Sequence, residues 1–253
     1  MKVRILGCGT STGVPKIGND WGRCDPSEPR NTRLRTSILV ESAAERMLVD
    51  CGPDLRQQLL AAGINELAGV IVTHAHADHC HGIDELRPVS QAIQAPLRLH
   101  ARREVLDRLR QSFPYAFTRT NFYRPILEPR ELRGDLGFGA ARVRFADQPH
   151  GGITSLGLRF DEGERSIGYA VDFSKLNDDM LALYEGVDVW IADCLTRQPH
   201  PTHMHLDGVL SAARDLRVGQ LYLVHMGNGL DYRQLVSELP DWAAPAYDGL
   251  ELC

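Results

Sequence analysis

The chain has 253 residues, of which 43% are hydrophobic and 24% are charged, and its formal net charge at pH 7 is -5. That charge gives the whole protein no attraction for nucleic acid or an anionic membrane, and no apolar stretch approaches the ~18 residues that a membrane-spanning helix needs. The six cysteines are scattered without a CxxC pair, and the N-terminus begins like a strand and not like a signal peptide; we therefore expect a cytoplasmic protein with reduced thiols.

Apolar runs alternate with amphipathic segments along the chain. Short runs rich in β-branched and aromatic residues predict strands at 2–7, 36–41, 46–50, 69–73, 96–100, 141–147, 153–160, 165–171, 187–193 and 220–225. Amphipathic periodicity predicts helices at 53–62, 101–112, 175–184, 206–216 and 231–238. The stretch 113–135, rich in Pro, Arg and aromatic residues, is expected to be a loop excursion. This pattern predicts one α/β domain over residues 1–253, with two mixed sheets and outer helices.

Four strong metal ligands follow the predicted strand 69–73 within six positions, namely His74, His76, Asp78 and His79. Histidine and aspartate are poor strand formers, and so many polar side chains crowded at a strand end leave buried polar groups unless a cation organises them. Neutral imidazole and carboxylate are ligands that first-row divalent metals prefer. A solvated polar turn is the alternative, but the density of ligands favours a metal site.

Further ligand candidates also lie just beyond predicted strands. His150 follows strand 141–147 after a short loop, Asp172 follows 165–171, and His225 ends 220–225. Asp50 ends 46–50 and precedes a Cys-Gly-Pro sequence. A lone histidine after a strand is more often a surface residue than a ligand, but all these strand ends can converge on one edge of a layered α/β fold.

The order of these residues resembles the metallo-β-lactamase superfamily of binuclear hydrolases. The resemblance extends over nearly the whole chain and implies a four-layer αββα sandwich of two mixed β-sheets flanked by helices. Four further segments resemble its PhnP-like branch, typified by a cyclic-phosphate phosphodiesterase and related to ribonuclease Z: 6–15, 29–37, 192–194 and 200–204.

The resemblance implies two divalent metal ions, zinc or manganese with iron as a further option. It assigns His74, His76 and His150 to the first metal, Asp78, His79 and His225 to the second, and Asp172 to a bridging position. Two cations about 3.5–4 Å apart can share a hydroxide, which would serve as the nucleophile. Asp50 is predicted to accept a hydrogen bond from a ligand imidazole, with a turn-forming role before Gly52 as the alternative.

A displaced oxygen needs a proton, and the resemblance assigns this general acid to His203. Asp78 and Asp172 complete the catalytic set that the resemblance implies. His200 and His205 are nearby alternatives, although His205 would point elsewhere if the loop is extended. The three histidines could also flank the helix at 206–216 without any role.

The chain departs from the PhnP-like pattern in one respect. That branch holds a separate structural zinc with a cysteine-rich loop and a second histidine three residues past the last ligand. Here the loop at 16–24 retains only Cys24, and the histidine position is Asn228. One thiolate and one amide cannot close a tetrahedral site, so no structural zinc is expected.

The segment 98–133 contains nine arginines and four acidic residues. Its arginines and aromatic residues could clamp a phosphate and stack on a base or sugar; a solvated helix face with a dimer contact is the favoured alternative. Asn31 and Arg33 are two more candidate phosphate contacts. A homodimer is expected only by analogy.

We therefore predict a phosphodiesterase that acts on small cyclic phosphates or nucleotides, with a small phosphorylated substrate as its partner and no stable nucleic-acid or membrane partner. A tRNA 3′-processing endonuclease of the ribonuclease Z kind would need a long flexible arm and a basic surface, and neither is evident. A non-catalytic relative, such as the pyrroloquinoline-quinone biosynthesis protein, could dispense with ligands, whereas this chain retains all seven. Lactone or thioester hydrolysis on the same metals stays open.

Overall fold

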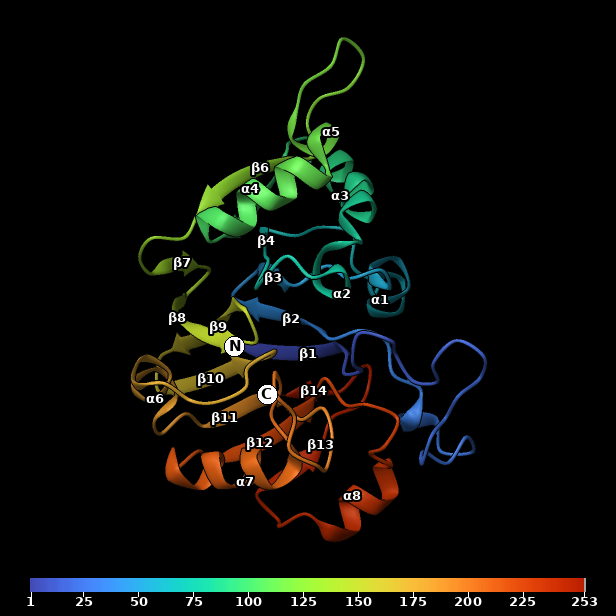
Figure 1. Cartoon of the computed structure of the whole chain (residues 1–253). Coiled ribbons are helices and arrows are strands. Elements are labelled where there is room, and N and C mark those ends of the chain that lie inside the picture. Colours follow the sequence, from blue (N-terminus) through green and yellow to red (C-terminus); the bar gives the residue numbers. More distant parts are fainter. Residues whose placement is uncertain (253) are drawn as a thin grey trace.

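Two seven-stranded β-sheets face each other at the centre of the computed structural model, which describes residues 1–252 (Figure 1). The first sheet has the order β14-β1-β2-β3-β4-β5-β6 and the second has the order β13-β12-β11-β10-β9-β8-β7. The first sheet comprises β1 (Lys2–Gly7), β2 (Ser37–Ser42), β3 (Glu45–Val49), β4 (Gly69–Ile71), β5 (Leu97–Ala101), β6 (Leu127–Glu131) and β14 (Glu251–Leu252). The second comprises β7 (Leu136–Phe138), β8 (Ala141–His150), β9 (Ile153–Glu162), β10 (Arg165–Ala170), β11 (Val189–Asp193), β12 (Gln220–Val224) and β13 (Ala243–Pro245).

Helices cover the outer faces of both sheets (Figure 1). On the side of the first sheet lie α1 (Leu55–Ala62), α2 (Ala77–Cys80), α3 (Arg87–Ala92), α4 (Arg103–Ser112) and α5 (Pro114–Phe117). On the side of the second lie α6 (Asp178–Tyr184), α7 (Leu206–Asp215) and α8 (Tyr232–Glu238). Two 3-10 turns, Pro29–Asn31 and Ile83–Leu86, complete the elements. The predicted α/β fold of two mixed sheets flanked by helices is confirmed.

Alternation along the strands divides the apolar side chains between two cores. In β2, Ile38 and Val40 pack between the two sheets, whereas Leu39 packs against the helices outside the first sheet. Successive strand residues point to opposite faces, so a sheet that is covered on both faces needs an almost continuous apolar run. This requirement explains why strands 2–7, 36–41 and 46–50 are recognisable in the sequence.

The ten predicted strands and five predicted helices are all present, with ends within three residues of the prediction. The loop expected at 113–135 is wrong in part, because the segment contains α5 and β6. Strand β6 is the edge of its sheet and pairs in parallel with β5 alone. An edge strand tolerates a polar sequence and a proline. The sequence of β6 therefore lacks the apolar pattern by which a strand is predicted. No helix within residues 1–252 is long and apolar enough to cross a lipid bilayer.

The predicted phosphate contacts Asn31 and Arg33 are wrong, because both side chains are buried and bonded within the protein. Arg33 is 1% exposed and donates hydrogen bonds to the carbonyl oxygens of Leu230 at 2.6 Å and Gly227 at 3.2 Å. The Asn31 amide donates to Asp231 Oδ2 at 2.7 Å. These hydrogen bonds connect the loop before β2 to the loop after β12. Cys24, in the loop before β2, is also buried.

Replacing Arg33 with methionine is expected to lower the free energy of unfolding by about 2–4 kcal/mol, because the buried carbonyl oxygens of Leu230 and Gly227 would lose their charged donor. Within residues 1–252, only the longer bonds from the Cys24 thiol at 3.5 Å and the Leu230 N–H at 3.3 Å would remain to them. Urea unfolding of Arg33→Met beside Arg23→Met checks this; Arg23 is an exposed arginine of the same loop. Equal stability of the two variants would contradict the structural role. The loss should be unchanged by EDTA, since the network consists of hydrogen bonds.

Candidate metal centre

The ligand candidates meet at one edge of the two sheets, where several strands end. Asp50 follows β3, His74 lies three residues past β4, and His150 is the last residue of β8, which extends beyond the predicted 141–147. Asp172 follows β10 and His225 follows β12. Asp50, Asp172 and His225 have positive φ angles of 63°, 54° and 57°. Such left-handed backbone is uncommon outside glycine and occurs often at functional sites.

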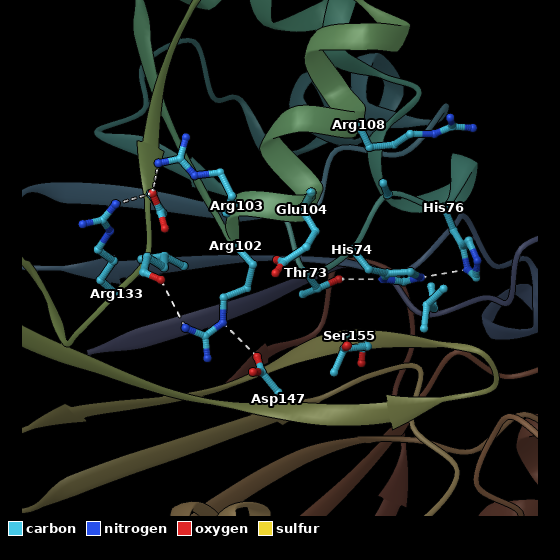
Figure 2. Close-up of a pocket in the computed structure, with 16 residues that line it drawn as sticks. Thr73, His74, His76, Arg102, Arg103, Glu104, Arg108, Arg133, Asp147 and Ser155 are labelled. Carbon is cyan, nitrogen blue, oxygen red and sulfur yellow. Dashed lines mark hydrogen bonds and ion pairs between the residues drawn. The ribbon is translucent and has the colours of Figure 1, made fainter.

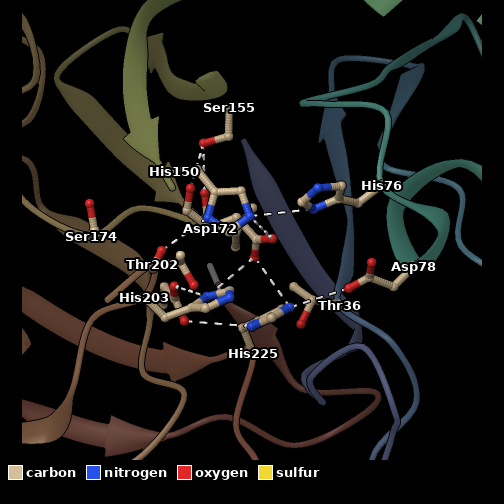
Figure 3. A network of polar contacts seen from close by, with 12 residues as sticks. Thr36, His76, Asp78, His150, Ser155, Asp172, Ser174, Thr202, His203 and His225 are labelled. Carbon is tan, nitrogen blue, oxygen red and sulfur yellow. Dashed lines mark hydrogen bonds and ion pairs between the residues drawn. The ribbon is translucent and has the colours of Figure 1, made fainter. Parts of the chain in front are cut away.

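Three histidines and one carboxylate form the first cluster, and Figure 3 shows three of these residues, His76, His150 and Asp172. His74 Nε2 lies 2.9 Å from His76 Nδ1, and His150 Nε2 lies 3.3 Å from the same atom. Asp172 Oδ2 is 3.2 Å from His74 Nε2 and 3.3 Å from His150 Nε2. Four potential ligand atoms therefore point into one small space.

A second cluster shares Asp172 with the first. Asp78 Oδ2 is 3.2 Å from His79 Nε2 and 3.4 Å from His225 Nε2. The other oxygen of Asp172, Oδ1, lies 3.2 Å from His225 Nε2. Asp172 thus directs one carboxylate oxygen to the first cluster and its other oxygen to the second.

The donor set fits divalent cations. Despite these close contacts, the buried atoms His79 Nε2, Asp172 Oδ1 and His225 Nδ1 have no hydrogen-bond partner within residues 1–252, and buried polar atoms are normally paired. Burial lowers the pKa of His74 to about 4, which keeps this imidazole neutral and able to bind a metal. Burial would also lower the pKa of His225, but the carboxylates of Asp172 and Asp193 raise it to about 10. The cluster therefore has an excess of negative charge that protons or metal cations must balance.

Asp50 contacts one of the candidate ligands, His79, on the side of its ring away from the second cluster. It is fully buried, and it accepts hydrogen bonds from His79 Nδ1 at 2.7 Å, from the Thr73 backbone N–H at 2.8 Å and from the Thr73 hydroxyl at 2.9 Å. The bond to Nδ1 leaves His79 Nε2 directed at the second cluster. In the same way, His150 Nδ1 donates to the Thr202 carbonyl oxygen at 2.9 Å, which leaves its Nε2 for the first cluster.

His203 lies beside both clusters. Its ring is stacked on that of His225, with 5.0 Å between the ring centroids, and its Nδ1 lies 2.9 Å from Asp193 Oδ2. Asp193 is fully buried at the end of β11. Asp193 belongs to the segment 192–194 that carries the resemblance, but no role was predicted for it; its place at a strand end was the available signal.

The other two histidines of this loop have different positions. His200 is exposed, and its Nδ1 accepts a hydrogen bond of 3.4 Å from the Thr202 backbone N–H. The His205 ring lies against Gly208 on α7. His203 is thus the histidine of this loop that the structure brings to the metal clusters.

A cavity of about 340 Å³ opens over the centre. Its wall includes His76, Asp78, His150, Asp172 and His203. The ligand candidates and His203 are thus accessible to a small molecule from one side.

A β-lactamase superfamily domain matches residues 45–226, a range that includes every predicted ligand. The chain belongs to the metallo-β-lactamase superfamily. With the His/Asp clusters described above, this membership makes it a metal-dependent hydrolase.

Among solved structures, a diphosphatase from the PhnP family is 32% identical to this metallo-β-lactamase superfamily member, with a TM-score of 0.91 over 99% of this chain and 96% of that one. The Zn²⁺-bound PqqB of Methylobacterium extorquens is 19% identical with a TM-score of 0.81, covers 100% of both chains, and shares the fold. The predicted resemblance to the superfamily and to its PhnP-like branch is confirmed.

Two curated relatives are matched over only part of their own length. An octanoyltransferase of Porphyromonas gingivalis is 31% identical over 258 residues, which are 99% of this chain and 51% of that protein. The chain therefore spans about half the length of that relative. A ribonuclease Z of Bradyrhizobium sp. is 42% identical over 62 residues, or 24% of this chain and 21% of the relative.

Proposed function

We propose that this protein is a phosphodiesterase that uses two divalent metal ions to hydrolyse a small phosphorylated substrate. The observation that carries the proposal is the carboxylate of Asp172, which directs one oxygen to each of two ligand clusters. The similarity to a diphosphatase of the PhnP family supports phosphoryl chemistry. A small substrate agrees with the 340 Å³ cavity, and we propose neither a nucleic-acid nor a membrane partner.

The residues divide into two binding sets. His74, His76 and His150 would hold one cation, Asp78, His79 and His225 would hold the other, and Asp172 would bridge them. When bound, such a pair of cations lowers the pKa of water toward ~7 and neutralises charge on a phosphoryl oxygen. Imidazole with carboxylate ligation suits Zn²⁺, Mn²⁺ or Fe²⁺.

His203 is proposed as the general acid. Asp193 holds its Nδ1 at 2.9 Å, so Nε2 is the ring nitrogen that can donate a proton to the leaving oxygen. The side chain lines the cavity beside Asp78 and Asp172. Asp193 therefore orients the His203 ring, as a buried carboxylate does in other acid–base pairs.

Elemental analysis of the purified protein, together with hydrolysis assays, tests this function. We expect two metal ions per chain and turnover of bis(p-nitrophenyl) phosphate and 2′,3′-cyclic nucleotides that EDTA abolishes and added Zn²⁺ or Mn²⁺ restores. Three metal ions per chain would instead indicate a structural zinc and contradict its predicted absence from the 16–24 loop. Two metal ions without phosphodiester hydrolysis would contradict the proposal and favour ester, lactone or thioester substrates.

A further inference from the structure

The shared position of Asp172 between the two ligand clusters depends on an unusual backbone conformation. Its φ of 54° lies in the left-handed region, which costs free energy for residues that have a side chain and persists only where the surrounding structure determines it. Strand β10 ends two residues earlier, at Ala170. Side chains of two neighbouring strands contact the backbone at this point instead.

Ser155 and Gln148 hydrogen-bond to the carbonyl groups of Val171 and Asp172. The Ser155 hydroxyl donates to the Asp172 carbonyl oxygen at 2.7 Å, and the Val171 carbonyl oxygen is its more distant acceptor at 3.2 Å. Gln148 Nε2 donates to the Val171 carbonyl oxygen at 2.9 Å and to Ser155 Oγ at 3.0 Å. Figure 3 shows the Ser155 hydroxyl directed toward Asp172. Both side chains are buried, so these bonds are shielded from water.

The register of three neighbouring strands brings these residues together. Gln148 of β8 is paired with Ser155 of β9. Strand β9 is antiparallel to β10, and this register, carried beyond its last pair of Leu158 with Tyr169, places Asp172 opposite Ser155. The two side chains thus continue the pairing of the sheet past the end of β10.

Helix α6 fixes the other end of this network. The hydroxyl of the fully buried Tyr184 lies 3.1 Å from Gln148 Oε1 and 2.9 Å from the Tyr169 carbonyl oxygen. Gly157 leaves the space for this contact, because a Cβ there would overlap both the Tyr184 hydroxyl and the Gln148 amide. The amide cannot turn over without placing its oxygen against the Val171 carbonyl oxygen, so its donors stay directed at the Asp172 turn.

Contact with a substrate is the competing role for Ser155. A cavity of about 900 Å³ adjoins the metal centre, and Ser155 lies on its wall with His74 (Figure 2). However, the Ser155 side chain is only 2% exposed, and its one hydroxyl proton is donated to the Asp172 carbonyl oxygen. The hydrogen bonding therefore favours a role toward Asp172.

We propose that Ser155 and Gln148 are positioning residues for the metal-bridging carboxylate. By holding the carbonyl groups of Val171 and Asp172, they keep the Asp172 backbone left-handed and its two carboxylate oxygens directed at the two ligand clusters. The proposal rests on the two-metal site of the proposed function, in which Asp172 is the shared ligand. Removing a group that orients a metal ligand typically lowers metal affinity or activity by about 10–100-fold.

Mn²⁺ binding to metal-free Ser155→Ala and Gln148→Met, measured by calorimetry without substrate, tests the proposal. Both substitutions remove the donors and leave every predicted ligand in place. The second Mn²⁺ ion is expected to bind about tenfold or more weakly than in the parent. Electron paramagnetic resonance of the doubly loaded variants should show weaker coupling between the two ions. A hydroxyl that only contacts substrate would leave both measurements at the parent's values.

Ser90→Ala is the matched control. Ser90 is a buried serine of α3 whose hydroxyl donates to the Ala95 carbonyl oxygen at 2.8 Å, and it belongs to neither ligand cluster. It should lose a comparable amount of stability in urea and keep the parent's Mn²⁺ affinity and spectrum. Equal weakening of Mn²⁺ binding in Ser90→Ala and Ser155→Ala would indicate a general effect of lower stability and overturn the proposal.

Hydrolysis of 2′,3′-cyclic nucleotides by the parent separates this proposal from the proposed function. Weaker binding of the second ion in Ser155→Ala and Gln148→Met supports the positioning role even if the parent hydrolyses no phosphodiester. Parent-like Mn²⁺ affinity and coupling in both variants refute it even if the phosphodiesterase activity is real. A parent that binds fewer than two Mn²⁺ ions would refute both.

Discussion

Replacing Asp172 with asparagine or alanine is expected to abolish bridging ligation, to leave fewer than two metal ions per chain, and to reduce phosphodiester turnover by about 10³-fold or more. The reason lies in the geometry of one carboxylate: Oδ2 lies 3.2 Å from His74 Nε2 and Oδ1 lies 3.2 Å from His225 Nε2. No other carboxylate in the described range 1–252 belongs to all the ligand groups. Elemental analysis and turnover of the two variants are the measurements.

Backbone conformation decides which substitution is the cleaner test. Asp172 has a φ of 54°, a conformation that asparagine adopts more readily than alanine. Asp172→Asn should therefore keep the melting temperature of metal-free protein near that of the metal-free parent, whereas Asp172→Ala adds backbone strain. If Asp172→Asn kept two metal ions and the parent's turnover, the bridging role would be refuted.

Most of the candidate site could be predicted because its residues follow recognisable strands. A buried parallel strand is a short apolar run, and the polar residue after it lies at the carboxyl edge of the sheet. His74, Asp172 and His225 satisfy this rule, so their approximate convergence follows from topology. The distances between them depend on the packing of two sheets against each other, which no local pattern encodes.

Arg33 and Asp193 show where sequence reasoning reaches its limit. An arginine in a polar loop looks solvent-facing, but Arg33 is buried by carbonyl groups nearly two hundred positions away in the chain. Asp193 acquires its partner only because the loop after β11 returns His203 to the same strand end. These relationships are set by tertiary structure, and edge strands such as β6 and β14 are similarly defined by the neighbours with which they pair.

Replacing His203 with alanine is expected to leave two metal ions in place and to lower kcat by about 10²–10⁴-fold, the range typical of a general acid. The loss should be larger for 2′,3′-cyclic nucleotides than for bis(p-nitrophenyl) phosphate, because p-nitrophenolate leaves readily without a proton and a ribosyl oxygen does not. A side chain that only supported the fold would slow both substrates equally. His205→Ala is the matched control, since the His205 ring lies against Gly208 and outside the clusters.

Metal content separates the general acid from a ligand. His203 Nδ1 lies 3.9 Å from Asp172 Oδ1 and 2.9 Å from Asp193 Oδ2, so a third cation site shared with Asp193 and His225 is the competing role. If His203→Ala lost metal as completely as Asp172→Ala, His203 would be a ligand. Retained metal, together with a rate loss that grows with the basicity of the leaving oxygen, is consistent only with proton donation from the ring that Asp193 orients.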